Sequence, residues 1–399
     1  MLLISVHNDI IEAAINSIFR NWRDLWPGGL VDEQYSTLNL MAHCRSGELG
    51  YNLAVCQTCH AKQWYASSCG DRHCPNCLGP RQAKWSQKVC ERLPDCPHFH
   101  VVFTLPRELD EFFRLNYRVA ANLLFGAASE TLQQFQKNNW KMKGGYFAVL
   151  HTWGSSLNWH PHLHLLVAAG GQDISTGCWR QARKNYLFAV KAMSKVFGAI
   201  LLRELESLES ESSIQWPEQI ATVEVRRDWR LLLATKNWNI FSRPTLKNTR
   251  AVVRYLARYT SQIAMSNHRI DEVDEEKRTV TFKWKDYRDG GRSKLMKLSG
   301  YEFMRRFTRH IVPKGFRRVR YYGFLSGSAE KVRNILGSPT ESIGEKSAKE
   351  PAKECENCDG TEWRYVTFYQ HLAGMREGML RFGSEGAESF SLVNRRRAP

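Results

Sequence analysis

The sequence has no apolar run long enough to cross a membrane, which takes about 20 consecutive residues. It also lacks the early basic residues of an export leader, because Met1 to Phe19 contains neither lysine nor arginine. This segment is apolar only in patches and includes acidic residues, so it predicts an amphipathic helix. We therefore expect a cytoplasmic protein with no membrane partner.

Two further absences narrow the class of protein. No stretch matches the Gly-x-x-x-x-Gly-Lys-Ser/Thr phosphate loop, which argues against an intrinsic helicase or ATPase motor. No segment of the chain repeats itself. A length of 399 residues predicts two or three units with at least one sizeable core.

Negative charge is scarce in this chain. Its 40 acidic residues stand against 57 lysines and arginines, which leaves a net charge of +17. Such an excess predicts a polyanionic partner. Because 13 tryptophans and 14 tyrosines accompany the charge, some of them can stack on bases, and nucleic acid is favoured over membrane.

The hydrophobic pattern of the middle of the chain predicts a sheet with helices. A strand over 100–105 precedes a helix that reaches about residue 137, and strands over 146–153 and 160–169 predict a hairpin. A second helix is expected over 179–209. This order predicts an α+β fold in which helices cover one face of an antiparallel sheet. A further hairpin is expected over 278–298, with a turn at its Asp-Gly-Gly.

Cysteine is concentrated before residue 100. In a reducing compartment the 11 cysteines are better explained as metal ligands than as disulfides. Cys56 and Cys59 form one Cys-x-x-Cys pair, and Cys74 and Cys77 form another, with fourteen residues between the pairs. This spacing predicts that the two pairs close around one structural Zn²⁺.

The other cysteines leave alternatives open. Cys44 and Cys69, with histidines nearby, either form a second zinc site or simply pack in the core. Cys355 and Cys358 form a third Cys-x-x-Cys pair, which has no second pair to close with, so no zinc is expected in the tail. We expect four segments: an N-terminal helical segment (1–37), a zinc-binding module (38–97), a catalytic α+β domain (98–327), and a linker with a basic tail (328–399).

A His-x-His pair begins the strand over 160–169. Because alternate side chains of a strand share a face, His162 and His164 project together, whereas Leu163 turns toward the core. Two neighbouring imidazoles provide half of a metal site. The expected ion is Mg²⁺ or Mn²⁺. The third ligand stays open, with His160 and Gln262 as candidates.

Two tyrosines lie one helical turn apart further along the chain. The segment 251–266 predicts an amphipathic helix in which Tyr255 and Tyr259 border the apolar face, beside Arg254 and Arg258. A phenol is a poor nucleophile at neutral pH unless a cation stabilises the phenolate. With a divalent ion at the histidines, one tyrosine can attack a phosphodiester, and a second tyrosine allows two strands to be held at once.

Together these motifs resemble those of the HUH-superfamily, two-tyrosine rolling-circle transposases of bacterial insertion sequences. The resemblance extends over about residues 38–327 and excludes the tail. Six blocks occur in the family's order: Arg72–Cys77, Phe103–Pro106, His160–His164, Tyr255–Tyr259, Lys285–Arg288 and Pro313–Arg318.

The resemblance implies an HUH endonuclease domain that cleaves and transfers single-stranded DNA through a 5′-phosphotyrosine. It assigns His162 and His164 as metal ligands and Tyr255 and Tyr259 as nucleophiles. The implied partners are single-stranded DNA at the insertion-sequence ends and target DNA, with a host helicase as a further candidate, and the implied location is the nucleoid. Two alternatives remain: a rolling-circle replication initiator, and a catalytically inert, zinc-dependent DNA-binding regulator.

Several basic residues are candidates for phosphate contacts. They lie beside the two tyrosines, on the exposed face of the hairpin over 278–298, and in the basic run that follows it. The candidates are Arg254, Arg258, Lys283, Lys285, Arg317, Arg318 and Arg320.

Overall fold

The computed structural model describes residues 14–90, 92–94, 96–182, 186–245, 264–327 and 354–368. The chain divides into two compact units, each made of separate stretches of sequence. Unit 1 comprises residues 1–11, 43–69 and 350–399, and unit 2 comprises residues 12–42 and 70–349. These units differ from the four consecutive segments expected from the sequence. Among the described helices, none is both long and apolar enough to span a bilayer.

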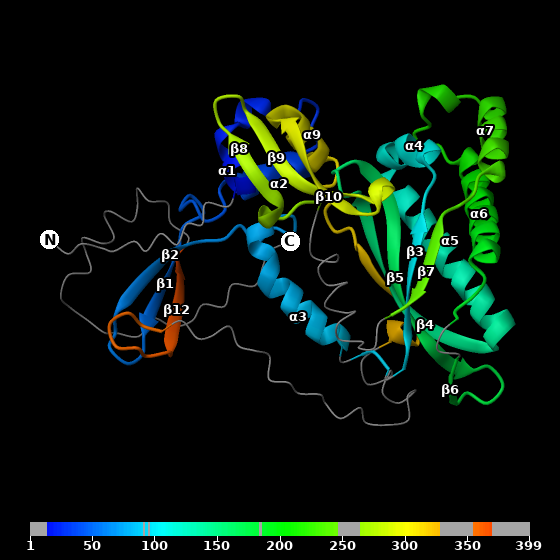
Figure 1. Cartoon of the computed structure of the whole chain (residues 1–399), viewed down its shortest axis with the longest axis horizontal. Coiled ribbons are helices and arrows are strands. Elements are labelled where there is room, and N and C mark those ends of the chain that lie inside the picture. The colour runs from blue at the N-terminus through cyan, green and yellow to red at the C-terminus, as the bar shows by residue number, and fades with distance from the viewer. Residues whose placement is uncertain are drawn as a thin grey trace. The chain divides into compact units, whose positions relative to one another are not determined.

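The main sheet of unit 2 is antiparallel throughout, as the sequence predicted. Its strands lie in the order β11-β4-β5-β3-β7, and β6 pairs with β5 (Figure 1). The two longest strands, β4 and β5, form the expected hairpin. The strand bounds are β3 His98–Thr104, β4 Met142–Trp153, β5 Trp159–Asp173, β6 Trp179–Gln181, β7 Ile240–Pro244 and β11 Val319–Gly323.

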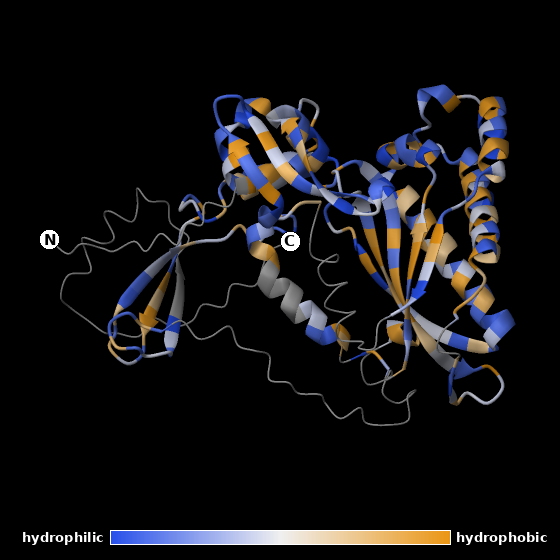
Figure 2. Cartoon of the chain, viewed as in Figure 1, coloured by the Kyte–Doolittle hydropathy of each residue, from blue (hydrophilic) through white to orange (hydrophobic). Residues whose placement is uncertain are grey.

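Helices cover one face of this sheet. Phe99, Val101 and Phe103 of β3 pack there with Leu163 and Leu165 of β5 in the largest apolar cluster of the unit. Each such side chain contributes roughly 1.5–3 kcal/mol when it is fully buried. The apolar stripes of these strands and helices are visible in Figure 2. The helices on this side are α4 Asp110–Leu115, α5 Tyr117–Phe135, α6 Val190–Ser207 and α7 Val223–Thr235.

The opposite face of the sheet carries a second, smaller apolar cluster. Phe147 and Val149 of β4 and Leu166 and Ala168 of β5 form this cluster with Val89 of α3 (Leu78–Cys90). Further along the same strands this face carries histidines instead of apolar residues. The division of the face into an apolar part and an imidazole part positions the candidate active site.

The predicted helix over 179–209 is wrong in its first part. Trp179–Gln181 forms β6, and helix α6 starts only at Val190. The reason is a close approach at two glycines of β5. A Cβ atom on Gly170 would lie 2.7 Å from the ring of Trp179, so only glycine allows β6 to pair there.

A second, three-stranded sheet of unit 2 confirms the predicted hairpin. Its order is β10-β9-β8, with Val280 opposite Leu298 across the β9–β10 pair. The N-terminal helices pack on this sheet together with α9, because Trp22 lies against Gly300 and Phe19 against Phe307. The bounds are α1 Ala14–Asn21, α2 Asp32–Ala42, β8 Ile270–Asp274, β9 Thr279–Asp286, β10 Arg292–Ser299 and α9 Gly300–Thr308.

Unit 1 contains a sheet that joins distant parts of the sequence. Its strands are β1 Tyr51–Cys56, β2 Lys62–Ala66 and β12 Trp363–Phe368, in the order β12-β1-β2. The tail strand β12 pairs with β1 along its whole length, from Tyr51 opposite Phe368 to Cys56 opposite Trp363. The described part of the tail, residues 354–368, is therefore part of this unit.

Candidate active site and metal centres

Three imidazoles converge on the face of the main sheet opposite the helices. His151 of β4 and His162 and His164 of β5 place one ligand nitrogen each within 4.8 Å of the others. His151 lies opposite His162 across the hairpin, and His164 follows on the same face of β5. Three nitrogen ligands on rigid strands form a site that can hold a divalent ion and leave positions open for substrate.

The third member of this group was not among the expected ligands. His160 does not belong to it, and Gln262 lies outside the described residues. His151 had no local signal, since a single histidine in a strand is ordinary. The signal was in the predicted hairpin: pairing 146–153 with 160–169 antiparallel brings His151 beside His162.

A hydrogen bond to a carbonyl fixes which nitrogen of His162 faces the site. His162 Nδ1 donates to the carbonyl oxygen of His160 at 2.6 Å, which leaves the lone pair on Nε2. That Nε2 lies 3.1 Å from Nε2 of His164. His164 Nδ1 lies 2.8 Å from Nε2 of His100, so a lone pair on His164 Nε2 requires that Nδ1 donate to His100. With His164 in that tautomer, both rings direct an unprotonated nitrogen at the same point.

Burial keeps these rings neutral. Desolvation lowers the pKa of His162 to about 3, aided by the neighbouring His160, and it lowers the pKa of His164 well below the usual value. Burial likewise lowers the pKa of His100 to about 4. Neutral imidazole is the form that binds metal, so the site is ready for an ion at neutral pH.

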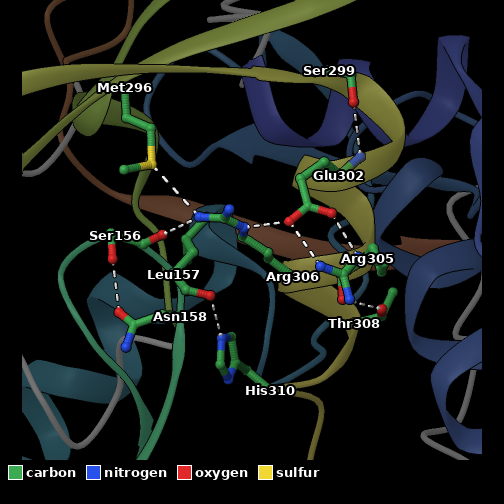
Figure 3. A network of polar contacts seen from close by, with 10 residues as sticks. All are labelled: Ser156, Leu157, Asn158, Met296, Ser299, Glu302, Arg305, Arg306, Thr308 and His310. Carbon is green, nitrogen blue, oxygen red and sulfur yellow. Dashed lines mark hydrogen bonds and ion pairs between the residues drawn. The ribbon is translucent and has the colours of Figure 1, made fainter.

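The turn that connects β4 with β5 is held from outside (Figure 3). Arg306 of α9 donates to the carbonyl oxygen of Ser156 at 3.0 Å, and His310 Nε2 donates to that of Leu157 at 3.2 Å. The other nitrogen of His310 accepts from the hydroxyl of Thr152 at 3.1 Å. Because the turn joins the two ligand strands, these bonds stabilise their register.

In unit 1 a second group of possible ligands consists of four thiols. Cys56, Cys59, Cys355 and Cys358 have sulfur atoms within 4.8 Å of one another. Cys56 Sγ lies 3.7 Å from Cys358 Sγ, and Cys59 Sγ lies 3.5 Å from Cys355 Sγ. Sulfurs bound tetrahedrally to Zn²⁺ are about 3.8 Å apart for a Zn–S bond of about 2.3 Å, so this geometry fits zinc.

The two Cys-x-x-Cys turns of this group have the same backbone. The N–H of His60 donates to the carbonyl of Cys56 at 3.0 Å, and that of Asp359 donates to the carbonyl of Cys355 at 2.8 Å. His60 and Asp359 both have positive φ, of 58° and 55°. The backbone N–H of Cys59 contributes most to lowering the pKa of the Cys56 thiol, to about 6.

This arrangement corrects the predicted ligand set. The sequence paired Cys56 and Cys59 with Cys74 and Cys77 and left the tail pair without partners. The structure instead completes the first pair with Cys355 and Cys358, because β12 pairs with β1 and brings the tail turn alongside. Spacing along the chain could not reveal this, since about 300 residues separate the two pairs.

The Cys74–Cys77 turn is anchored on unit 2 by the residues before it. Arg72 donates to the carbonyls of Phe316 and Pro313 at 2.8 and 2.9 Å. His73 Nε2 accepts from the N–H of Val312 at 3.2 Å. Two of the six blocks in the sequence, Arg72–Cys77 and Pro313–Arg318, are therefore in contact with each other.

The structure separates the candidate DNA-binding residues. Lys283 forms an ion pair with Asp271 of β8 at 3.2 Å, so its charge is already balanced. Lys285 and Arg317 are exposed. The nucleophile candidates Tyr255 and Tyr259, with Arg254 and Arg258, lie outside the described residues.

Arg318 is not a surface cation, contrary to expectation, whereas Arg320 is partly exposed. Arg318 is buried, and its guanidinium carbon lies 5.9 Å from the ring of Trp153, which itself stacks on His151 with ring centroids 4.5 Å apart. Burial lowers the pKa of Arg318 to about 10. Arg320 lies over the ring of Phe125 at 4.0 Å. In an extended segment, successive side chains point to opposite sides, so the residues of one basic run face different environments. The composition of the run does not show which of its residues are buried.

Family models of transposases match both parts of the chain. The model described as "Transposase zinc-binding domain" matches residues 14–105, and the model described as "Putative transposase" matches residues 145–333. The second match contains the three imidazoles. The first contains the Cys56, Cys59, Cys74 and Cys77 pairs but not the tail pair.

Among solved structures, the chain is similar to the conjugative relaxase TrwC. The metal-bound complex of TrwC with oriT DNA is 12% identical, with a TM-score of 0.24, over 41% of this chain and 71% of that one. A complex of TrwC with a 27-mer DNA gives a TM-score of 0.23 at 12% identity, over 40% of this chain and 71% of that one.

Two relatives cover most of the sequence. A protein of Sinorhizobium fredii named "Putative transposase y4qJ" is 33% identical over 357 residues, which are 85% of this chain and 89% of that one. The transposase for insertion sequence element IS801 of Pseudomonas savastanoi pv. phaseolicola is 34% identical over 304 residues, 75% of this chain and 72% of that one. With both family models in agreement, the chain belongs to the two-tyrosine rolling-circle transposases of bacterial insertion sequences, and it carries their zinc-binding domain.

Proposed function

We propose that this transposase cleaves and rejoins single-stranded DNA at the ends of an insertion sequence, through a 5′-phosphotyrosine intermediate. The observation that carries the proposal is the group of His151, His162 and His164, whose ring nitrogens lie within 4.8 Å of one another on one face of the main sheet. Three neutral nitrogen ligands this close together can hold a divalent ion against a phosphate oxygen.

The three imidazoles would hold a divalent ion, which would act as a Lewis acid on a phosphate oxygen. A set of nitrogen ligands favours Mn²⁺ over Mg²⁺, although Mg²⁺ is more abundant in cells. Neighbouring side chains and backbone groups position the ligands. His160 and His100 fix the tautomers, and the bonds of Arg306 and His310 hold the turn between the ligand strands.

Tyr255 or Tyr259 would supply the nucleophile. The phenol loses its proton and its oxygen bonds to phosphorus, while the bond from phosphorus to the 3′ oxygen breaks and the leaving oxygen takes up a proton. The chain is long enough for Tyr255 to reach the ion site, because the ten residues from Thr245 to Tyr255 span at most about 35 Å. The strand β7 that precedes them lies beside β3, two strands from β5, which is about 10 Å.

The test is a covalent adduct on labelled single strands that carry the element's ends. With Mn²⁺, the wild-type chain should form a complex that survives denaturant, and Tyr255→Phe/Tyr259→Phe should bind the strand without forming it. His162→Ala/His164→Ala should also lose the adduct. A double Phe variant that still forms the adduct would exclude these tyrosines as nucleophiles.

We also propose one structural zinc ion, bound by Cys56, Cys59, Cys355 and Cys358, whose sulfur spacing fits a tetrahedral Zn²⁺. This assignment keeps Cys56 and Cys59 of the predicted zinc module as ligands and gives them the tail pair as partners.

A further inference from the structure

We propose that the edge strand β7 is a stacking platform for the single-stranded DNA, on which Phe241 stacks against an unpaired base and Arg243 contacts the adjoining phosphate. The inference deepens the proposed function and rests on it. It concerns how the strand is held beside the ion site, not how it is cleaved.

The strand register places these two residues on the face of the imidazoles. Val102 of β3 lies opposite both His164 of β5 and Phe241 of β7. His100, two residues earlier on β3, lies opposite Arg243. Because directly opposed residues of a sheet share a face, Phe241 and Arg243 project on the same side as the ligands.

A continuous row of rings connects Phe241 with the ion site. The ring of Phe241 meets that of His100 edge to face, with centroids 6.5 Å apart and planes at 74°. His100 in turn stacks on His164, with centroids 5.1 Å apart and planes at 10°. A base on Phe241 would therefore belong to a nucleotide close to the phosphate at the ligands.

Exposure marks Phe241 as a binding residue. Its side chain is 52% exposed, although phenylalanine usually lies in the core. The guanidinium carbon of the exposed Arg243 lies 5.8 Å from the centroid of its ring. Aromatic side chains on an open strand face stack with unpaired bases, and a neighbouring arginine adds attraction to phosphate and to the base.

Charge also favours this edge over the second sheet. Among the described residues, no carboxylate forms an ion pair with Arg243. In contrast, Lys283 pairs with Asp271, and Lys294 pairs with Asp286 at 2.8 Å. An unbalanced cation beside an exposed ring fits a nucleotide better than it fits an apolar peptide.

The experiment measures the affinity of the full chain for a fluorescein-labelled single strand that carries the element's end, without divalent ion. Phe241→Ala should weaken binding by about 5- to 150-fold, the usual range for loss of one stacked base. Phe241→Leu should weaken it similarly because an apolar side chain without a ring cannot stack. Phe241→Trp should keep the affinity within about twofold of the wild type.

The control is Leu231→Ala. Leu231 is 61% exposed on α7, and this apolar surface is not part of the proposed platform. The control should bind as the wild type does. Arg243→Gln should reduce the slope of log affinity against log salt by about 0.7, the value for one phosphate contact on a single strand.

A base-specific probe completes the test. With 2-aminopurine placed at successive positions of the strand, the wild type should change the fluorescence strongly at one position, and Phe241→Leu should abolish that change. Equal affinities for wild type, Phe241→Ala and Phe241→Leu would overturn the platform. Because no cleavage is measured, this result is independent of whether the adduct forms, so the two proposals fail separately.

Discussion

At the scale of single residues, the neighbours of the ligands determine how the candidate site works. His164 can direct Nε2 at an ion only while its Nδ1 has an acceptor, and that acceptor is His100 at 2.8 Å. Metal-binding histidines more often donate to a carboxylate or a carbonyl. A neutral imidazole in that position makes His164 a weaker base than a carboxylate would.

His100→Ala should therefore weaken Mn²⁺ binding by about 10- to 100-fold, the usual cost of removing such a partner. His100→Gln retains an acceptor oxygen and should lose less. Calorimetric titration of each variant with Mn²⁺ measures the difference without any DNA. Wild-type affinity in His100→Ala would show that the hydrogen bond does not support the ligand.

Two adjacent arginines make a matched pair. The sequence indicates the same role for Arg317 and Arg318, whereas the structure exposes the first and buries the second against Trp153. Arg318→Ala should lower the free energy of unfolding by about 2–4 kcal/mol, because the buried side chain loses its packing against Trp153 and leaves a cavity. Arg317→Ala should change stability by less than about 0.5 kcal/mol and weaken DNA binding in a salt-dependent way. Thermal unfolding and binding assays of the two variants should thus give opposite patterns; equal stability would contradict the burial of Arg318.

At the scale of elements, the β4–β5 hairpin is the part that carries the site. Its turn is held by a fully buried histidine, His310, which donates to Leu157 and accepts from Thr152. Burial lowers the pKa of His310 to about 4. Below about pH 6.5 the unfolded chain binds a proton at His310, whereas the folded chain does not. The free energy of unfolding therefore decreases as the pH falls from about 6.5 to 4.

Between pH 7 and pH 5, His310 should cost the wild type about 2 kcal/mol of unfolding free energy. His310→Asn can still donate and accept but cannot titrate, so its stability should fall less over the same interval. Urea unfolding at both pH values gives the comparison. Parallel losses in the two proteins would mean that His310 is not kept neutral by the fold.

The hairpin also shows how far pattern analysis reached. Alternation and turn residues predicted both strands, their antiparallel pairing and the shared face of His162 and His164, and the structure agrees. The same hairpin extends further than expected, to Asp173, because glycines there admit β6. The contacts of Arg306 and His310 with the turn had no local signal, since these residues lie about 150 positions away in the sequence.

At the scale of the whole molecule, the described part of unit 1 comes from two distant stretches of chain. Its sheet needs β12, and its thiol group needs Cys355 and Cys358. A structural zinc site in a small unit contributes much of the folding energy, on the order of 10 kcal/mol in zinc-finger peptides. The tail is thus expected to be essential for the fold of this unit.

Cys355→Ser/Cys358→Ser should reduce the zinc content by one ion per chain, as measured by inductively coupled plasma mass spectrometry. It should also increase proteolysis within residues 43–69, because this part of unit 1 depends on the lost ion. Cys178→Ser changes an exposed thiol outside every described ligand group and should alter neither property. Full zinc content in the double variant would refute the assignment of the tail pair.

The sequence by itself determined the family, the α+β fold, the presence of thiol ligands and the two histidines of one strand. These features depend on local spacing and alternation, which persist whatever the rest of the chain does. Only the tertiary structure decided the partners from distant segments: the tail cysteines beside Cys56 and Cys59, and Arg318 behind the site instead of on the surface. Such partners depend on strand pairing and packing between distant segments, and the spacing of residues along a chain contains no record of which distant segments will meet.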